Sequence, residues 1–409
     1  MKQFSKAFLI LVSGILLGGG MLCLVYLLPT TGMQDHVRQS LNILLKEGES
    51  PVLLEGFKGS TLDNYTDALM LANACYKSEN IFYKAAMLVE RSSNEEGQPL
   101  ESLAGYLLEN TGEIRMYSRY WHGYLVFLKP LLMFLNYGQI RILNILIFLL
   151  VFFSVIVGFC RKRMWRGLIA FLFAFVSLFP FTIPCSLQFS TSFYIGNGAC
   201  IYMLWQHDSL KLQNDFFKFF LITGMLTSFM DYFTYPLFTF GMPLVIFVVL
   251  ERSNGWDKFM KVVEAGFYWG FGYFGMWLGK WILGSGLTRT NLFIDAVGSV
   301  AMRLSHEVYG EKISILIAIL RNGYIFFNIV GVSIAVFLMG WVTYEIRKFK
   351  NYIGKSSAKI LVVIAFFPII WYIAVTNHSY MHYWFTFRNL AISVFAIGMI
   401  PESLHRESI

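Results

Sequence analysis

Segments of about 20 mostly apolar residues recur along this chain of 409 residues, and they constrain its fold more than any other feature. Each segment is long enough to cross a hydrocarbon core of about 30 Å, and in lipid it must be helical because unpaired backbone amides find no partner there. Apolar residues make up 56% of the chain and charged residues only 14%. The sequence therefore predicts an all-α polytopic membrane protein and excludes a disordered chain, a soluble enzyme and a disulfide scaffold.

Hydropathy predicts about ten transmembrane helices, which form a single integral membrane domain over residues 1–409. The first is expected to be an uncleaved anchor, because its apolar stretch is longer than the core of a signal peptide and lacks a small-x-small cleavage site. The expected spans are 7–28, 139–159, 167–184, 186–205, 217–233, 236–250, 262–283, 316–341, 358–375 and 387–401.

The loops between these segments differ in charge, and the difference predicts their orientation. Residues 161–166, 211–218, 251–261 and 347–359, together with both termini, carry an excess of Lys and Arg, whereas residues 29–119 hold thirteen acidic and eight basic residues. Basic loops stay on the cytoplasmic side of a membrane. We therefore expect both termini in the cytoplasm and the first loop outside, and we attribute the net charge of +8 to cytoplasmic loops rather than to a nucleic-acid partner.

The extracytoplasmic first loop, residues 29–138, is too long for a simple connector and predicts juxtamembrane helices. The first is an amphipathic helix over Asp35–Glu47 that ends at Gly48, with four apolar residues on one face: Val37, Leu41, Leu44 and Leu45. A second helix is expected from about residue 62 to residue 77, and another begins at Pro99.

Residues 119–136 are aromatic and apolar, and Pro130 interrupts them. Counting this segment as a membrane crossing would break the charge alternation of all later loops. We therefore expect it to be a helix that lies in the outer interface, with its aromatic rings at the level of the lipid headgroups.

Polar and charged residues gather near the predicted outer ends of the helices. Ionisable groups at membrane depth are costly, so they are functional candidates, and an outward cavity holding both carboxylates and cations accommodates them. The alternative for each is structural, since Lys and Arg extend to headgroups and Asp caps helices. Candidates for binding a donor phosphate or sugar are Arg119, His122, Asp231, Lys280, Arg321, His378, His382, Trp384 and Arg388.

The segment 377–388 joins the last two predicted spans on the outside. Arg388 offers a planar fork for phosphate oxygens, His378 and His382 offer switchable donors, and Trp384 offers a stacking face. The two histidines are four residues apart, as in some metal sites, but no Glu lies nearby, so we expect no metal. The alternative is an interfacial aromatic belt. No cofactor is required by the sequence, and nothing in it supports a divalent cation.

Asp63 and Asp67 are four residues apart at the start of the second loop helix. One explanation is helix capping, because Asp near a helix N-terminus is favourable. The other is catalysis, in which one carboxylate removes a proton from an acceptor hydroxyl. The chain has no Asp-x-Asp pair, no glycine-rich P-loop and no Gly-x-Ser-x-Gly.

This layout resembles the GT-C superfamily of membrane glycosyltransferases. That family has an acidic residue opening a juxtamembrane helix after its first span, as in residues 35–48, where its usual Asp-Glu pair is Asp35-His36. Residues 120–141 follow the family in having aromatics and Pro before a short turn and an Ile-Arg step into the second span. Residues 62–67 and 228–231, the latter with Tyr235-Pro236, also resemble bacterial surface-polysaccharide proteins of this kind.

The resemblance implies an inverting glycosyltransferase in the bacterial cytoplasmic membrane whose active site faces outward. It would move a sugar from a polyprenyl-phosphate donor to a hydroxyl of a glycan or cell-wall polymer. Asp35, Asp63 or Asp67 would be the base, and Arg388, Lys280, Arg321 and Arg119 would stabilise the leaving lipid phosphate. Alternatives are a polysaccharide ligase or acyltransferase, and a flippase or transporter of lipid-linked sugars, although no inverted repeat is visible.

Overall fold

Long apolar helices make up most of the chain in the computed structural model, which describes residues 2–94, 98–253, 255–354 and 357–408. The expectation of an all-α chain is confirmed at this level. The strands that these residues form are two short antiparallel ribbons: β1 (Glu90–Ser93) with β2 (Glu113–Met116), and β3 (Glu307–Val308) with β4 (Glu311–Lys312).

Four helical stretches among the described residues are long and apolar enough to cross a membrane: α1 (Lys2–Val25), α7 (Tyr137–Arg161), α15 (Ile329–Lys348) and Tyr383–Ser408. The last combines α19 (Tyr383–Thr386), η4 (Phe387–Asn389), α20 (Leu390–Gly398) and α21 (Ile400–Ser408). The other helices of the bundle are α8 (Trp165–Ser177), α9 (Leu187–Gln213), α10 (Phe216–Met230), α11 (Leu237–Leu250), α12 (Gly255–Thr288), α16 (Ala358–Ala365) and α17 (Phe367–Ala374).

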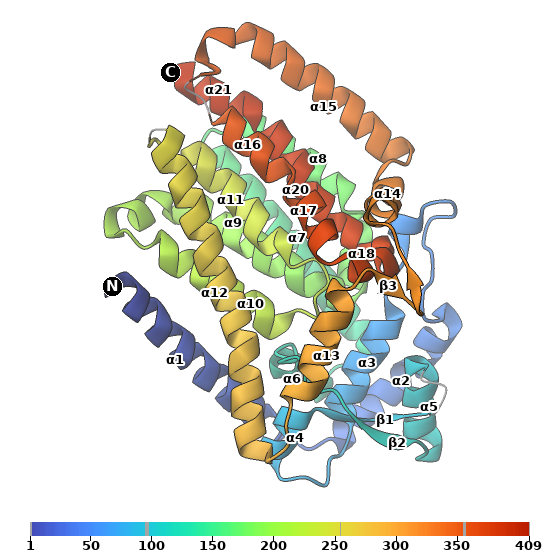
Figure 1. The fold of residues 1–409 in the computed structure, drawn as a ribbon. Coiled ribbons are helices and arrows are strands. Elements are labelled where there is room, and N and C mark those ends of the chain that lie inside the picture. Colours follow the sequence, from blue (N-terminus) through green and yellow to red (C-terminus); the bar gives the residue numbers. More distant parts are fainter. Residues whose placement is uncertain (1, 95–97, 254, 355–356, 409) are drawn as a thin grey trace.

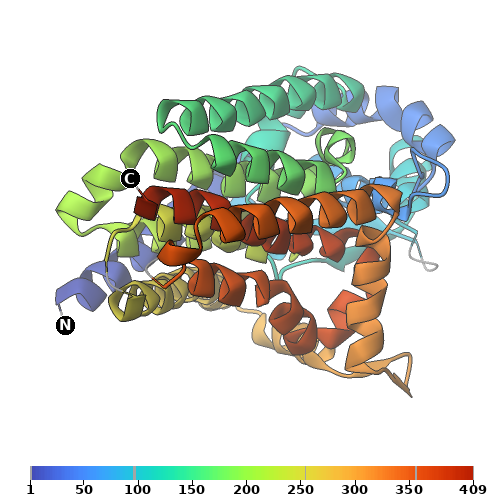
Figure 2. The same cartoon turned by 90° about the horizontal axis from the view of Figure 1, so that it is seen from above.

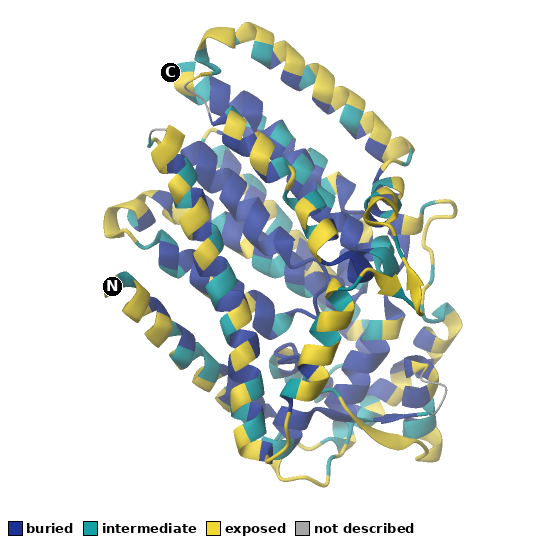
Figure 3. Cartoon of the chain, viewed as in Figure 1, coloured by how far each residue is buried: buried dark blue, intermediate teal, exposed yellow. Residues whose placement is uncertain are grey.

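Helix α11 lies at the centre of the bundle. Every one of its residues is buried, and Figure 3 shows it dark blue among the other helices, whereas α15 is largely exposed. The helix is apolar on all sides, as expected for one surrounded by other helices. An apolar helix exposed on one side, such as α15, has the character of a helix that faces lipid.

The bundle has two chemically different ends. At one, which we call the charged end, the described parts of the loops 161–166, 211–218, 251–261 and 347–359 lie near the C-terminus, joined by the ion pairs Arg166–Glu345 (3.1 Å) and Lys211–Glu251 (3.3 Å). Both marked ends of the chain lie on the left in Figures 1 and 2, and the orange β3–β4 ribbon lies on the right. Residues 29–138 form the opposite end, which we call the first-loop end (Figure 1).

The first loop folds into short helices. They are α2 (Thr31–Glu47), η1 (Lys58–Ser60), α3 (Asn64–Cys75), α4 (Phe82–Leu88), α5 (Pro99–Glu109) and α6 (Leu125–Leu132). The predicted amphipathic helix is confirmed: Val37, Leu41 and Leu44 are buried, and the Gly48 N–H donates to the Leu44 carbonyl at a φ of 77°. Leu45 was placed on the wrong face, because it is exposed.

Several predicted spans have different bounds. Residues 316–341 are not one helix: α14 (Ile315–Phe326) ends, and Asn328 then caps α15 by accepting hydrogen bonds from the N–H groups of Val330 (2.8 Å) and Gly331 (3.2 Å). The segment 167–184 is helical only to Ser177, and η2 (Pro180–Cys185) follows it. Proline and an N-cap residue interrupt these helices where hydropathy alone registers continuous apolar character.

The prediction of an interface helix over residues 119–136 is wrong in its first third. Residues 119–124 are not helical, His122 has a φ of 57°, and the Gly123 N–H donates to the Phe229 carbonyl (2.8 Å). Trp121 is fully buried and donates to the Met276 carbonyl (2.7 Å). The rings of Tyr120, Trp121 and Tyr124 are therefore buried in the protein, because the loop contacts α10 and α12, whereas Phe127 and Phe134, further along the segment, are exposed.

Candidate functional site

The first turn of α3 meets η1, η2, η4 and the start of α9 in a buried polar junction at the first-loop end. Asp63, Asp67 and Arg388 lie here, and all three side chains are buried. The Asp63 N–H donates to Ser186 Oγ (3.0 Å), and Arg388 donates to Thr182 Oγ1 (2.8 Å) and to the Gly59 carbonyl (3.3 Å). The structure thus brings together three sequence candidates from distant parts of the chain.

Asp63 is the N-cap of α3, as the capping explanation predicted, but capping uses only one of its oxygens. Oδ1 accepts from the Thr66 N–H (3.0 Å), whereas Oδ2 is buried and has no hydrogen-bond partner among the described residues. Burial raises the pKa of Asp63 to about 7; the nearby Asp67 also raises it, while the Thr66 hydrogen bonds and the charge of Arg388 lower it. A carboxylate with a free oxygen and a pKa near neutrality has the properties of a general base.

Asp67 has the opposite arrangement, because both of its oxygens are occupied. Oδ1 accepts from the backbone N–H groups of Leu187 (2.9 Å) and Gln188 (3.4 Å), and Oδ2 accepts from the Tyr137 hydroxyl. Burial raises the pKa of Asp67 to about 6, and the hydrogen bonds from Tyr137 and Leu187 limit the rise. Asp67 therefore joins α3 to the first turns of α7 and α9, which is a structural role.

Asp35 does not join the junction. Its side chain is exposed on α2 and pairs with Arg38 (2.6 Å), one helical turn further along. The Arg38 guanidinium also donates to the Leu107 carbonyl at the end of α5 (3.1 Å and 3.2 Å). Of the three candidate bases, Asp63 alone combines burial with an unoccupied oxygen.

Arg388 is fully buried and lies over the Phe189 ring, 4.1 Å from its centroid. Its Nε has no partner among the described side chains and backbone groups. Phe189 also contacts the loop that holds a second carboxylate, Asp231. Tyr235 lies in that loop, and its hydroxyl donates to the Phe189 carbonyl (2.5 Å). Asp231 accepts from Ser192 Oγ and the Thr234 N–H, both at 2.8 Å, and so fixes that loop.

The two histidines pack against each other in the segment that leads to Arg388. The His378 and His382 rings are 4.7 Å apart, and His378 packs edge-on against Phe233 at 4.8 Å. Trp384 packs against Phe189 at 6.0 Å. Among the described residues, no three His, Cys, Asp or Glu side chains form a group that could hold a metal ion.

The other cations have structural partners. Lys280 is buried and donates to the carbonyls of Met87 (3.0 Å) and Ala86 (3.4 Å), at the C-terminal end of α4. Lys129, which no sequence pattern singled out, donates in the same way to Ala74 near the end of α3 (2.7 Å). A buried cation at helical C-terminal carbonyls offsets their partial negative charge. These lysines fix the first loop on the bundle.

The remaining three candidates also make contacts within the fold. Arg119 pairs with Asp295 of α13 (Phe293–Leu304) at 3.0 Å. Arg321 stacks on Tyr380 at 4.1 Å and donates to its carbonyl (3.3 Å). His122 is buried, with Nδ1 2.9 Å from the Tyr232 hydroxyl and Nε2 2.5 Å from the Tyr117 carbonyl. These contacts account for the three side chains within the fold, and Arg321 also lies 4.6 Å from the centroid of the Tyr383 ring, beside the η1 turn.

A long apolar groove of about 1130 Å³ runs beside the junction, between α6, α7, α9 and α10. Its lining follows α9 from Leu187 to Gln213, and this helix of 27 residues is about 40 Å long. Polar lining residues lie toward both ends of the groove: Asn144, Ser190, Thr191 and Tyr194 in the first-loop half, and Ser209, Gln213, Asp215 and Lys218 in the charged-end half. The first turn of α9 separates the groove from Asp63 and Arg388, so the groove and the junction share one wall.

Comparisons with known proteins give no relative from which a function follows: no protein-family model, no curated protein and no solved structure matches this chain. The functional argument therefore depends on the geometry of the junction and of the groove.

Proposed function

We propose that the chain is a membrane glycosyltransferase of the GT-C type that transfers a sugar from a polyprenyl-phosphate donor to a hydroxyl of a glycan or wall polymer. The observation that carries this proposal is the juxtaposition of the apolar groove with a buried carboxylate, Asp63, whose Oδ2 is unoccupied by any described residue. A prenyl chain is a long apolar ligand, and the groove offers it a mainly apolar lining that follows α9 from Leu187 to Gln213.

In this proposal the first-loop end faces outward and both termini are cytoplasmic, with about ten helices or helix pairs crossing the membrane. The acceptor hydroxyl gives its proton to Asp63 Oδ2 while its oxygen attacks the anomeric carbon. The bond to the lipid phosphate breaks, configuration inverts, and the phosphate leaves with an added negative charge. Arg388 is a cation whose charge acts on Asp63, and in this proposal it stabilises the leaving phosphate.

The residues that cover the junction would have to move for the acceptor to reach Asp63. The cover is the turn around η1, which is held by the Arg388 contact with Gly59 and by Lys58, whose Nζ donates to the Tyr383 hydroxyl (2.8 Å). Lys58 is exposed, whereas Gly59 and Ser60 are buried and the turn also packs against Phe179. Local opening of such a segment requires much less free energy than global unfolding.

The groove also bears on the alternatives. A flippase or transporter needs a polar pathway through the full bilayer, whereas the groove is lined mainly by apolar residues, and its charged lining residues, Asp215 and Lys218, lie at the charged end. A ligase would share the lipid-linked donor and would differ in transferring a whole glycan. The donor in the assay therefore separates a ligase from a single-sugar transferase.

The test is transfer from a purified polyprenyl-phosphate sugar to an acceptor glycan by the protein in nanodiscs. Wild type should transfer one sugar, with a rate that rises with pH up to about 7, because Asp63 must be ionised to act as a base. Asp63→Asn should lose about 10²–10⁴ in rate, while Asp35→Asn, the matched carboxylate variant on the exposed face of α2, should keep it. Equal rates for wild type and Asp63→Asn would overturn the proposed base.

A further inference from the structure

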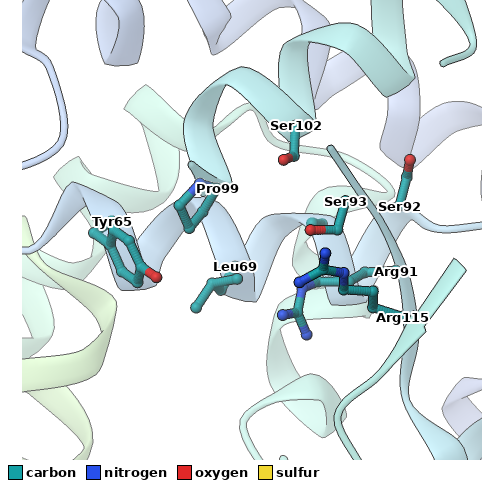
Figure 4. Close-up of a pocket in the computed structure, with 9 residues that line it drawn as sticks. Tyr65, Leu69, Arg91, Ser92, Ser93, Pro99, Ser102 and Arg115 are labelled. Atoms are coloured by element: carbon teal, nitrogen blue, oxygen red, sulfur yellow. The ribbon is translucent and has the colours of Figure 1, made fainter. Parts of the chain in front are cut away.

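A second, smaller pocket of about 130 Å³ opens in the first loop, apart from the junction and the groove. Figure 4 shows its position between the β1–β2 ribbon, α3 and the start of α5. Two guanidinium groups and several hydroxyls surround it. Its polar lining residues are Tyr65, Arg91, Ser92, Ser93, Ser102 and Arg115.

The two arginines occupy directly opposite positions of the antiparallel ribbon, where Arg91 pairs with Arg115. Opposite residues of such a pair project to the same face, and Figure 4 shows both guanidinium groups at the pocket. Like charges at directly opposite positions destabilise a ribbon. A ribbon with this pair at its centre is better stabilised when an anion lies between the two charges.

No described carboxylate neutralises the pair. Neither Arg91 nor Arg115 has an ion-pair partner within 4.0 Å among residues 2–94, 98–253, 255–354 and 357–408. Arg91 Nη1 is buried and has no hydrogen-bond partner there, and its guanidinium is held 4.9 Å from the centroid of the Tyr117 ring. A guanidinium that is held in place and has an unpaired buried N–H group can donate a hydrogen bond to a bound acceptor.

The start of α5 does not itself supply the site. The Leu100 N–H already lies 3.4 Å from Glu49 Oε1, so a carboxylate of the chain occupies that helix end. The binding groups are instead the two arginines and the hydroxyls of Tyr65 and Ser102, whereas the Ser92 and Ser93 hydroxyls already donate to the carbonyls of Thr111 (2.8 Å) and Asn94 (3.4 Å). Paired guanidinium forks with adjacent hydroxyls match the oxygens of a phosphate group better than those of a neutral sugar.

We propose that the Arg91–Arg115 pocket binds phosphate groups of an anionic polymer outside the membrane. That this polymer is the acceptor of the sugar rests on the proposed function. Tyr65 lies two residues beyond Asp63 on α3, so a chain held at the pocket lies along the helix that presents the proposed base. The pocket would then select acceptors that carry phosphodiesters over neutral glycans.

The test measures binding without any transfer reaction. Purified protein in nanodiscs is titrated with inorganic phosphate, with a phosphodiester oligomer of glycerol and with neutral dextran, and both melting temperature and heat of binding are recorded. Wild type should bind phosphate and the oligomer but not dextran. Arg91→Gln and Arg115→Gln should each weaken phosphate binding about 10-fold or more, as expected for loss of a charged hydrogen-bonding partner.

A melting temperature measured without ligand also distinguishes these arginines from purely structural ones, because replacing a purely structural arginine would not raise it. Removing one of two facing charges should raise the melting temperature of Arg115→Gln above that of wild type without phosphate, and phosphate should then reverse the order. Arg38→Gln, an arginine of the same loop that is paired with Asp35, is the matched control and should leave phosphate binding unchanged.

Two outcomes would overturn the proposal. Wild type could fail to bind phosphate, or Arg115→Gln could bind it as well as wild type does. Glu95 and Glu96 lie outside the described residues; if wild type fails and a variant with both replaced by Gln binds phosphate, these carboxylates neutralise the arginines. Failure of sugar transfer with phosphate binding intact would instead contradict the proposed function and leave the anion pocket standing.

Discussion

At the scale of single residues, the junction assigns different tasks to two carboxylates that look alike in sequence. Asp63 and Asp67 both lie in the first turn region of α3, and capping was a sound expectation for either. Their partners decide the difference: Asp67 meets residues about 70 and 120 positions away, Tyr137 and Leu187. No local pattern encodes such contacts, so the sequence could nominate the pair but could not separate its members.

Asp63 should make the protein less stable as the pH rises, and this can be measured. Burial raises its pKa to about 7 in the folded state, against about 4 when unfolded, so the folded state binds the proton more tightly. Ionisation therefore removes stability as the pH rises from about 4 through 7. Asp63→Asn keeps the cap without the charge, so its melting temperature should increasingly exceed that of wild type across this range. Parallel melting curves at all pH values would contradict this.

Asp67→Asn should lower the stability of the protein, whereas Asp63→Asn should raise it. The amide keeps one acceptor oxygen but places an NH₂ group against the Tyr137 hydroxyl or the Leu187 N–H, which leaves a buried donor without a partner. We expect a loss of about 1–3 kcal/mol in the free energy of unfolding, with urea or thermal melts as the measurement. Asp35→Asn, at an exposed position, should change stability by less than about 0.5 kcal/mol. Equal stabilities of the two variants would remove the structural role of Asp67.

At the scale of helices, α10 and α12 approach each other through glycines. A Cβ at Gly224 would lie 2.1 Å from the Trp269 carbonyl oxygen, and one at Gly272 would lie 2.2 Å from that of Leu221. Small residues allow such close contact between helix backbones in membranes. Hydropathy predicted both helices, but it does not indicate which face of each helix contacts which neighbouring helix.

Gly224→Ala should therefore destabilise the protein by about 1–3 kcal/mol, because the methyl group meets backbone rather than a movable side chain. Gly270→Ala in α12 is the matched control, since no described atom outside its own helix turn lies within 4 Å of the place its methyl group would take. That substitution should be neutral or slightly stabilising, as Ala is favoured over Gly in a helix. Melting temperatures of the two purified variants test the contrast, and an unaffected Gly224→Ala would show that the helices separate easily.

At the scale of the whole molecule, charge patterning predicted more than helix boundaries did. The four basic loops lie together at the charged end, where Arg166 pairs with Glu345 and Lys211 pairs with Glu251. The acidic first loop lies at the other end, where Glu47 pairs with Arg141 (2.8 Å). Burial would raise the pKa of Glu47, but hydrogen bonds from Arg141 and Asn64 outweigh it and lower that pKa. Loop charge is a property of the sequence alone, whereas helix ends depend on caps and prolines whose effect is settled by packing.

The membrane orientation is the last prediction, and the structure supplies the positions to test it. Glu113, exposed on β2, probes the first-loop end. Leu212, 87% exposed in the last turn of α9, probes the charged end. In a background without the five native cysteines, Glu113→Cys should react with an impermeant maleimide in intact cells and Leu212→Cys should react only after permeabilisation, because basic loops stay in the cytoplasm. The reverse labelling would place Asp63 and the Arg91–Arg115 pair on the cytoplasmic side, where a polymer outside the membrane could not reach them, and the glycosyltransferase proposal would fail with the orientation.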